Sequence, residues 1–198
     1  LRVGTLWGLN ALCGKPLPAP RLLDLAIALE GHPENAAASV MGGLVACAQT
    51  RFGMRVVRLE PPKGLVFVAA IPDRIQKTEA ARRMLPKRVP FADAVHNTTH
   101  AAALVAALGS GRLDLLPGLF DDRLHQPARA RLMYYLPRLV RAAEKAGALG
   151  AFLSGSGSTV LAACATARAA AVSRAMGRGM PKGTVRILRA EGAGVRPV

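Results

Sequence analysis

The stretch GALGAFLSGSGSTVLAACA, residues 147–165, restricts the fold more than any other part of this chain. Two apolar runs flank a short loop, SGSGST at 154–159, in which serine alternates with glycine. Gly155 and Gly157 permit positive φ angles and leave the nearby backbone N–H groups open to a phosphate or carboxylate. We expect two strands joined by this loop, which is either an anion-binding loop or an ordinary hairpin turn.

Helical and strand patterns follow one another through the rest of the chain. Apolar residues at helical spacing predict helices at 6–13, 20–30, 78–85, 90–109, 137–146 and 167–177. Runs rich in β-branched residues predict further strands at 42–49, 54–60, 65–72 and 184–190. Helices between strands, together with direct strand-to-strand connections, indicate an α+β fold with helices on one face of a mixed or antiparallel sheet. The segment EPPKG, residues 60–64, is the expected crossover between a first domain at 1–61 and a second at 62–198.

The charge of the chain narrows the classes of partner. The 27 Lys and Arg against 12 Asp and Glu give +15, and the first 50 residues are balanced, so the surplus lies after them. A nucleic-acid-binding module would explain this surplus, because Lys and Arg neutralise phosphates. However, aromatic residues make up only 4% and the basic residues are scattered singly, so stacking platforms are few. Scattered surface residues fit this pattern better, a small anionic substrate would also suit the charge, and a basic RNA-binding module is the alternative.

The cysteines and the apolar runs indicate the compartment. Cys13, Cys47 and Cys164 are far apart and lie in apolar surroundings, so we interpret them as buried small side chains and not as disulfide or zinc ligands. No apolar run approaches the roughly 18 residues of a membrane span. We expect a cytoplasmic protein in a reducing environment, without a membrane partner.

The segment HNTTH, residues 96–100, places two histidines four residues apart on a predicted helix. That spacing suits zinc, but Asn97 stands where a zinc protease has its glutamate, and no further ligand is suggested nearby in the sequence. We therefore expect two partly exposed helix histidines.

The segment EGHPENAAASVMGG, residues 30–43, gathers several candidate ligand groups. We place Glu30 at the C-terminal end of the helix at 20–30, where the helix dipole disfavours an anion by about 0.3–1 kcal/mol. The carboxylate therefore needs a cation partner, which could be a hard metal ion. His32 and Asn35 could hydrogen-bond a polar ligand. The alternative is a helix cap followed by ordinary polar loop residues.

Two arginines complete the candidate site. Arg82 lies in the predicted helix at 78–85, and Arg129 follows LHQP in an irregular stretch. The planar guanidinium group binds carboxylates and phosphates through two parallel hydrogen bonds. Taken alone, each is either an anion ligand of this kind or a solvated surface arginine.

Four segments together resemble the homoserine kinases, a branch of the GHMP small-molecule kinases. EGHPENAAASVMGGLV is similar to their EGHPDN and GG signature, and IPDRIQKTEAARRMLP to their T-x-x-A-R…LP segment. RLHQPAR is similar to their H-E-P-x-R segment, and AFLSGSGSTVLA to their third motif, which usually has proline where Ser158 stands here. The segments keep the family's order from near residue 1 to about residue 190. The resemblance implies the two-domain GHMP kinase architecture, with a ferredoxin-like C-terminal domain.

The resemblance also implies an activity and roles for the candidate residues. The family transfers the γ-phosphoryl group of ATP to the hydroxyl of L-homoserine, forming O-phospho-L-homoserine in threonine biosynthesis. By resemblance, Glu30 would coordinate Mg²⁺, and His32 and Asn35 would position the amino acid. Arg82 and Arg129 would hold the substrate carboxylate. Gly155, Ser156 and Gly157 would close over the ATP phosphates.

The resemblance implies catalysis without a general base. Many relatives place an aspartate in the site, whereas this chain presents Asn35 in that region, and an asparagine cannot usefully accept a proton near neutral pH. Glu30 and Asn35 would then be the catalytic residues, acting through alignment and charge neutralisation. Phosphoryl transfer allows this because its loose transition state needs little assistance from a base.

Some positions depart from the family pattern. The G-L-G-S-S-A phosphate loop is expected immediately before residue 1, so we expect that an N-terminal part is missing and that this chain alone turns over weakly or not at all. Glu34 replaces the commoner Asp, and His96 and His100 stand where Phe and Arg or Gln are frequent. A GHMP kinase for another small alcohol is therefore the alternative within the family. L-homoserine is the expected partner, and a homodimer is one of the assemblies left open.

Overall fold

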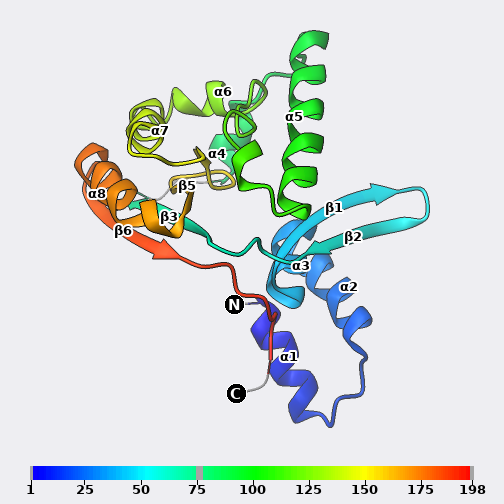
Figure 1. Ribbon diagram of the computed structural model, residues 1–198. Coiled ribbons are helices and arrows are strands. Elements are labelled where there is room, and N and C mark those ends of the chain that lie inside the picture. The colour runs from blue at the N-terminus through cyan, green and yellow to red at the C-terminus, as the bar shows by residue number, and fades with distance from the viewer. Residues whose placement is uncertain (1, 75–77, 197–198) are drawn as a thin grey trace. The chain divides into compact units, whose positions relative to one another are not determined.

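The computed structural model describes residues 2–74 and 78–196, and the chain in it forms two compact units (Figure 1). Unit 1 comprises Leu1–Pro61 and Ala190–Val198, and unit 2 comprises Pro62–Arg189. Part of the segment IPDRIQKTEAARRMLP, residues 75–77, lies outside the described residues. Among the described helices, none combines the length and the apolar character needed to cross a lipid bilayer.

Unit 1 begins with three helices that share a small core. They are α1 Arg2–Leu12, α2 Ala19–Glu30 and α3 Pro33–Met41. Val3, Ala26 and Ala36 bring one buried residue from each helix to this core. The sequence pattern predicted the first two helices but not α3, because ENAAASVM has small residues where a helical stripe of large apolar residues is expected. Small side chains let the three helices approach closely around this core.

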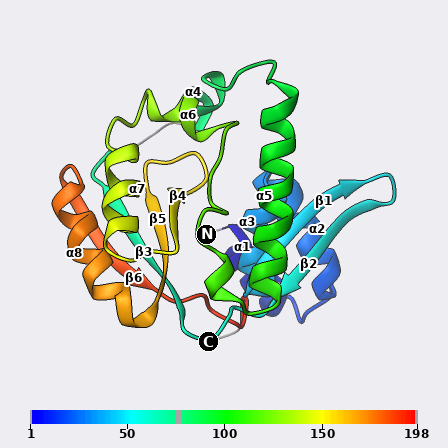
Figure 2. The same cartoon turned by 45° about the horizontal axis from the view of Figure 1, so that its top comes forward.

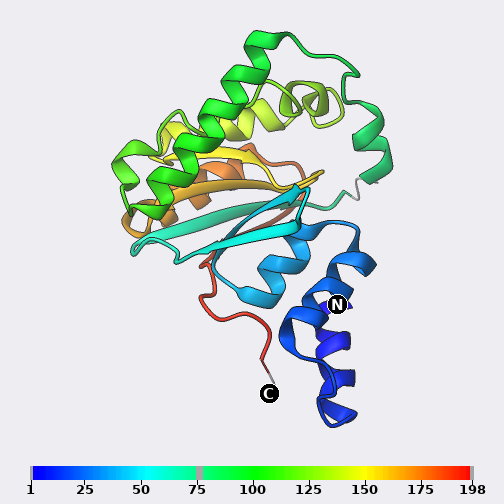
Figure 3. The same ribbon diagram turned by 90° about the vertical axis from the view of Figure 1, so that its right-hand side faces the viewer.

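A two-stranded antiparallel ribbon completes the regular structure of unit 1. It is formed by β1 Leu44–Thr50 and β2 Gly53–Leu59, with Leu44 opposite Leu59 and Thr50 opposite Gly53. Both strands were predicted from their β-branched residues. Helix α3 packs against β1, and Figure 3 shows the three helices gathered beside the ribbon within this unit.

The C-terminal tail returns to unit 1, whereas the expected boundary placed it in a second domain at 62–198. The Val195 N–H donates to the Ser39 carbonyl at 3.0 Å, and the Gly43 N–H donates to the Glu191 carbonyl at 2.7 Å. Arg58 connects the ribbon to the tail by donating to the Gly192 carbonyl. The tail belongs with unit 1 because hydrogen bonds from main-chain N–H groups and from Arg58 hold it there. A hydrophobic pattern in the sequence does not predict such bonds.

Unit 2 contains a four-stranded antiparallel sheet. Its strands are β3 Leu65–Pro72, β4 Gly150–Leu153, β5 Val160–Ala165 and β6 Gly183–Leu188. The order across the sheet is β4-β5-β3-β6. The predicted pair of strands around the glycine loop is the β4–β5 hairpin, in which Leu153 lies opposite Val160. The sheet is therefore purely antiparallel, one of the two arrangements that the sequence left open.

The helices of unit 2 follow the predicted pattern closely, with short additions. They are α4 Thr78–Arg83, α5 Phe91–Gly109, α6 Gln126–Ala130, α7 Leu136–Lys145 and α8 Ala169–Gly179, with the 3₁₀ turns η1 Leu113–Leu115 and η2 Thr166–Arg168. Helix α6 was not predicted, because its five residues are too few to show a helical period.

Both faces of the sheet are covered, which corrects the expectation of helices on one face only. Val66 and Val68 of β3 pack into a buried cluster with Leu139 of α7 and Val172 of α8. These two helices lie side by side in Figure 2.

The opposite face carries a second cluster. Leu65 of β3 and Ala163 of β5 pack there with Ala107 near the end of α5 and with Leu116 after η1. A strand buried on both faces reads as a continuous apolar run, and LVFVAAIP is such a run. The sequence thus carried the signal for two covered faces.

The docking of the tail can be tested at Gly194. A Cβ atom there would collide with the Val40 carbonyl oxygen, whereas a Cβ at Gly192 would have its nearest neighbour, Glu60 Oε2, at 3.9 Å. We expect Gly194→Ala to lower the free energy of unfolding of unit 1 by about 1–3 kcal/mol, the usual effect of overpacking. Gly192→Ala is the matched control and should be nearly neutral. Equal urea midpoints for both variants would show that the tail is not docked on unit 1.

Candidate active site

The predicted site residues fall into two groups, one in each unit. Glu30, His32 and Asn35 belong to unit 1. Arg82, Arg129 and the segment Gly155–Gly157 belong to unit 2. Each group has its own local geometry.

The first group lies at a tight corner between two helices. Helix α2 ends at Glu30, and Gly31 caps it in the left-handed region at φ 69°, donating its N–H to the Ile27 carbonyl. His32 is the N-cap of α3 with extended backbone, and Pro33 is the first helical residue. Proline suits that position because its fixed φ is helical and it has no N–H to leave unpaired. The corner places the C-terminus of one helix next to the N-terminus of the other.

Glu30 has a cation partner within the chain. Arg2 Nη1 lies 3.4 Å from Glu30 Oε2 and donates to the Leu29 carbonyl at 2.6 Å. The guanidinium group therefore supplies the positive charge that a carboxylate at this helix end requires. The Glu30 side chain is still one-third exposed (33%), and an ion pair at this distance on the surface is weak. Its carboxylate oxygens are hard donors that fit a Mg²⁺ ion.

His32 and Asn35 flank the start of α3. His32 Nδ1 lies 3.6 Å from Glu34 Oε1, and the imidazole ring is about one-third exposed. Asn35 is exposed, and its main-chain carbonyl accepts a hydrogen bond from Ser39 Oγ at 2.9 Å. The Asn35 side-chain amide makes no hydrogen bond to another residue of the described ranges. It is therefore available to a polar ligand.

In unit 2 the glycine loop is fixed at one end and open at the other. Gly155 and Gly157 have positive φ angles of 54° and 87°. A Cβ atom at Gly157 would collide with the buried Met133, whereas one at Gly155 would meet nothing within 4 Å. Ser158 fixes the far end, because its hydroxyl donates to the Arg74 carbonyl at 2.6 Å and its own carbonyl accepts from Tyr135 Oη at 2.9 Å. The loop is thus packed at Gly157 and open to a ligand at Gly155.

Arg129 is bound to this loop. Its Nη1 donates to the Gly155 carbonyl at 2.7 Å and lies 3.2 Å from His125 Nδ1. Its Nε is buried and has no hydrogen-bond partner in residues 2–74 and 78–196. Burial lowers the pKa of Arg129, the charge of Asp122 acts in the opposite direction, and the nearby charge of Arg82 lowers the pKa further. The positive charges of Arg129 and Arg82 are therefore close enough to repel each other, and an anion near Arg129 would offset this repulsion.

Asp122 holds the short helix that carries Arg129, and sequence reasoning missed it. Its carboxylate accepts hydrogen bonds from the N–H groups of Leu124, His125 and Gln126, and from the side-chain amide of Asn97 in α5. Burial alone would raise the pKa of Asp122, but these donors and the nearby His125 outweigh burial and lower it. Pro127 near the start of α6 is a recognisable helix start signal, but Asp122 lies three residues before the N-cap His125, so no capping pattern pointed to it.

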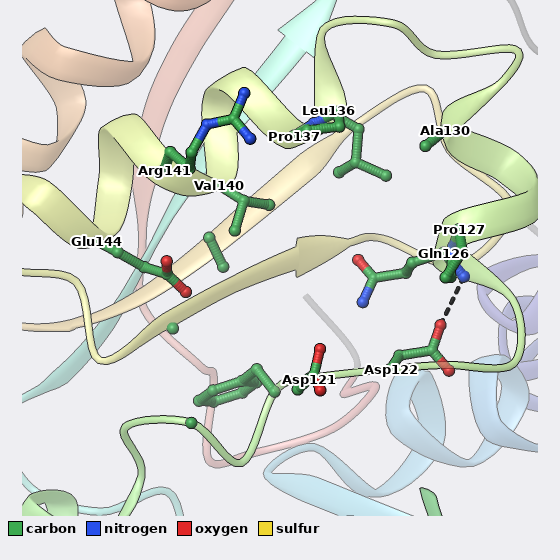
Figure 4. Close-up of a pocket in the computed structure, with 14 residues that line it drawn as sticks. Asp121, Asp122, Gln126, Pro127, Ala130, Leu136, Pro137, Val140, Arg141 and Glu144 are labelled. Atoms are coloured by element: carbon green, nitrogen blue, oxygen red, sulfur yellow. Dashed lines mark hydrogen bonds between the residues drawn. The ribbon is translucent and has the colours of Figure 1, made fainter. Parts of the chain in front are cut away.

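A cavity of about 290 Å³ lies on the α7 side of the same segment (Figure 4). Asp121 and Glu144 face it from two sides, and Gln126 and Val140 also line it. The residues that line this cavity include none of the predicted site residues. The cavity therefore does not coincide with the cationic loop site.

Comparison with known proteins finds similarity to small-molecule kinases. Residues 103–182 match the family described as GHMP kinases C terminal. The chain is 47% identical over 164 residues to a homoserine kinase of Moorella thermoacetica and 44% identical over 152 residues to one of Deinococcus radiodurans. These matches cover 82% and 77% of this chain, and 55% and 50% of the respective relatives. The chain thus spans about half the length of the curated relatives it matches.

Solved structures give the same result for the fold. The crystal structure of homoserine kinase from Cytophaga hutchinsonii superposes with a TM-score of 0.90 at 28% identity, covering 97% of this chain and 64% of that chain. A mevalonate kinase of L. major, crystallised with R-mevalonate, superposes with a TM-score of 0.71 at 20% identity over 93% of this chain and 63% of that chain, which shows a shared fold alone.

The cap formed by Asp122 predicts a pH-dependent stability. Because the pKa of Asp122 is lowered in the folded state, its carboxylate is protonated at a higher pH in the unfolded state than in the folded state. The stabilisation is therefore present above a pH of about 4 and is lost as the pH falls below it. We expect Asp122→Asn to lower the free energy of unfolding at pH 7 by about 1–3 kcal/mol.

The measurement is urea unfolding of the wild type and the variant from pH 7 to pH 3. The stability difference should shrink as the pH falls through the lowered pKa of Asp122. The exposed Asp24 on α2 provides the control, since Asp24→Asn should change stability little at any pH. A difference for Asp122→Asn that stays constant down to pH 3 would contradict the charged cap.

Proposed function

We infer that the chain belongs to the GHMP kinase family and that it is part of an ATP-dependent homoserine kinase. The reaction transfers the γ-phosphoryl group of ATP to the hydroxyl of L-homoserine, giving O-phospho-L-homoserine and ADP, a step of threonine biosynthesis. The observation that carries this proposal is the 47% identity over 164 residues to a homoserine kinase. The cationic glycine loop of unit 2 supports it, because ATP carries phosphate groups and homoserine carries a carboxylate.

The two units correspond, in this proposal, to the two domains of the family. Unit 2 would be the ferredoxin-like C-terminal domain, since its chain order of strand, helices, hairpin, helix and strand with sheet order β4-β5-β3-β6 is the split βαβ arrangement. The family match at 103–182 lies wholly within it. The first 61 residues of unit 1 would be the remainder of the N-terminal domain.

Arg129 and Arg82 would hold the homoserine carboxylate. The support for Arg129 is its placement: Nη1 is committed to the Gly155 carbonyl, which fixes the plane of the guanidinium group. The second arginine adds positive charge from α4. His32 and Asn35, at the start of α3, would orient the remaining polar groups of the amino acid.

Glu30 and the segment Gly155–Gly157 would serve the nucleotide. The Glu30 carboxylate would bind the Mg²⁺ of MgATP, which neutralises phosphate charge in such reactions. The open backbone at Gly155, with Ser156 and Gly157, would approach the phosphates closely. Asn35 is not a base, so the acceptor hydroxyl would be activated by alignment and by the surrounding charge. The residues of this chain would therefore position and neutralise, and the hydroxyl proton would pass to water or to the transferred phosphate group, not to a side chain.

The proposed acceptor can be tested directly. The protein as encoded, including any residues that precede Leu1, is assayed by ADP release with L-homoserine, mevalonate and galactose in turn. We expect kcat/KM to be highest with L-homoserine by at least about 100-fold, because only an amino acid offers a carboxylate and an ammonium group to paired arginine and polar ligands. A preference for mevalonate or galactose would assign the chain to another branch of the family.

Two substitutions separate the roles of the two groups. Arg129→Lys should raise the KM for homoserine about 10- to 100-fold with a smaller effect on kcat, because a lysine cannot form the two-pronged contact. Glu30→Gln should instead lower kcat by orders of magnitude and make turnover less responsive to Mg²⁺. Arg138→Lys, at an exposed position of α7, is the control for Arg129. An unchanged homoserine KM in Arg129→Lys would reduce Arg129 to a structural residue of the loop.

A further inference from the structure

A compact group of two imidazoles and one carboxylate lies in unit 2, outside the residues of the proposed kinase site. His96 and His100 are four residues apart on one face of α5, and Asp121 follows η1 more than 20 residues later. One ligand atom of each residue lies within 4.8 Å of the others, and His96 Nε2 is 2.9 Å from Asp121 Oδ2. The sequence pattern indicated the two histidines but no third ligand. The fold brings Asp121 next to them.

The main chain orients one of these rings for coordination. His100 Nδ1 lies 2.8 Å from the His96 carbonyl oxygen, which can only accept a hydrogen bond. The proton of a neutral His100 must therefore lie on Nδ1, which leaves a lone pair on Nε2. Ligating histidines usually donate their other ring N–H to a carbonyl or carboxylate in this way. The ring of His96 lies 3.7 Å from that of His100, centroid to centroid, and its side chain is only 14% exposed.

The position of Asp121 is fixed by its neighbours. Asn97, between the two histidines, donates from Nδ2 to Asp122 Oδ1 at 2.6 Å and accepts from the Arg123 N–H at 2.9 Å. These bonds fasten Asp122 and Arg123, the two residues that follow Asp121, to α5. The main chain next to Asp121 is therefore held beside the two histidines by hydrogen bonds that no metal ion is needed to form.

The group also has access to solvent. His100 and Asp121 both line a cavity of about 230 Å³ between α5 and the segment leading to α6, with Asn97, Asp122 and His125. A cavity of this size has room for a water molecule as a further ligand. Two imidazole nitrogens, one carboxylate oxygen and a water are a ligand set that Zn²⁺ accepts in tetrahedral geometry. Mg²⁺ prefers oxygen ligands alone, so it is poorly matched to this group.

We propose that His96, His100 and Asp121 form a binding site for one Zn²⁺ ion, distinct from any Mg²⁺ that accompanies a nucleotide. The bound ion links the middle of α5 to the segment that carries Asp122 and leads into α6. It adds a second connection beside that of Asn97. The proposal is independent of the kinase activity, because none of the three residues belongs to the proposed kinase site.

Binding of the metal alone tests the site. The protein is freed of metal, titrated with Zn²⁺ by calorimetry, and titrated with Co²⁺ as a spectroscopic substitute that reports nitrogen and oxygen ligands in its visible absorption. We expect one ion per chain. His100→Ala and Asp121→Asn should each weaken binding by about 100-fold or more, since even outer partners of metal ligands contribute about 10- to 100-fold.

Matched controls come from the same residue types elsewhere in the chain. His32→Asn in unit 1 and Asp114→Asn after α5 should leave the affinity unchanged, because neither residue belongs to the group. Excess Zn²⁺ should raise the thermal midpoint of the wild type and of both controls, but not that of His100→Ala. Circular dichroism without metal verifies that each variant is folded.

Two results would overturn the proposal. The first is a wild-type protein that takes up no Co²⁺ or Zn²⁺ at a one-to-one ratio, in which case the three residues are only close neighbours in the fold. The second is binding that survives in His100→Ala and Asp121→Asn at wild-type affinity, which would place the ion elsewhere, for example at the exposed thiol of Cys13.

Discussion

The hydrogen bonds that the Asp122 carboxylate accepts are the interactions on which the arrangement of unit 2 depends. The carboxylate accepts hydrogen bonds from two main-chain N–H groups just before α6, from the N–H of Gln126, the first residue of α6, and from the side-chain amide of Asn97 in α5. A helix of five residues cannot form alone, because nucleation fixes several residues for few hydrogen bonds. The hydrogen bonds to Asp122 compensate for this unfavourable nucleation. Gln126 adds a further link by accepting a hydrogen bond from the Leu153 N–H of β4. Arg129 is held against the Gly155 carbonyl as a result.

The two units offer complementary chemistry. Unit 1 presents a carboxylate, an imidazole and an amide at the corner between α2 and α3, whereas unit 2 presents arginines and an open glycine backbone. A carboxylate that binds a metal ion and cations that bind anions are the two groups that a phosphoryl transfer needs. In the proposed function, the surplus of positive charge after residue 50 therefore serves an anionic small substrate. The structure of unit 1 also adds Arg2, which balances Glu30 within the chain.

Much of the fold could be predicted because its elements are long and regular. The strands at 65–72 and 184–190 are rich in β-branched residues, and the helix at 90–109 is long and rich in Ala and Leu. The structure contains β3, β6 and α5 at those places. The missed elements have no such signal: α3 is built from small residues, and α6 has only five residues. Cys13 was expected to be buried and is exposed, because it lies in the turn that follows the end of α1.

The sequence by itself determined the local features of this protein. The positive φ angles of Gly155 and Gly157, the helix corner at Gly31 and Pro33, and the apolar runs of the central strands all follow from the residues, because backbone sterics and hydrophobic periodicity act over a few positions. Only the tertiary structure decided which distant groups meet. Asp121 reaches His96, Arg129 reaches the Gly155 carbonyl, and the tail reaches Ser39 because hydrogen bonds between segments far apart in the chain depend on packing, which no local pattern encodes.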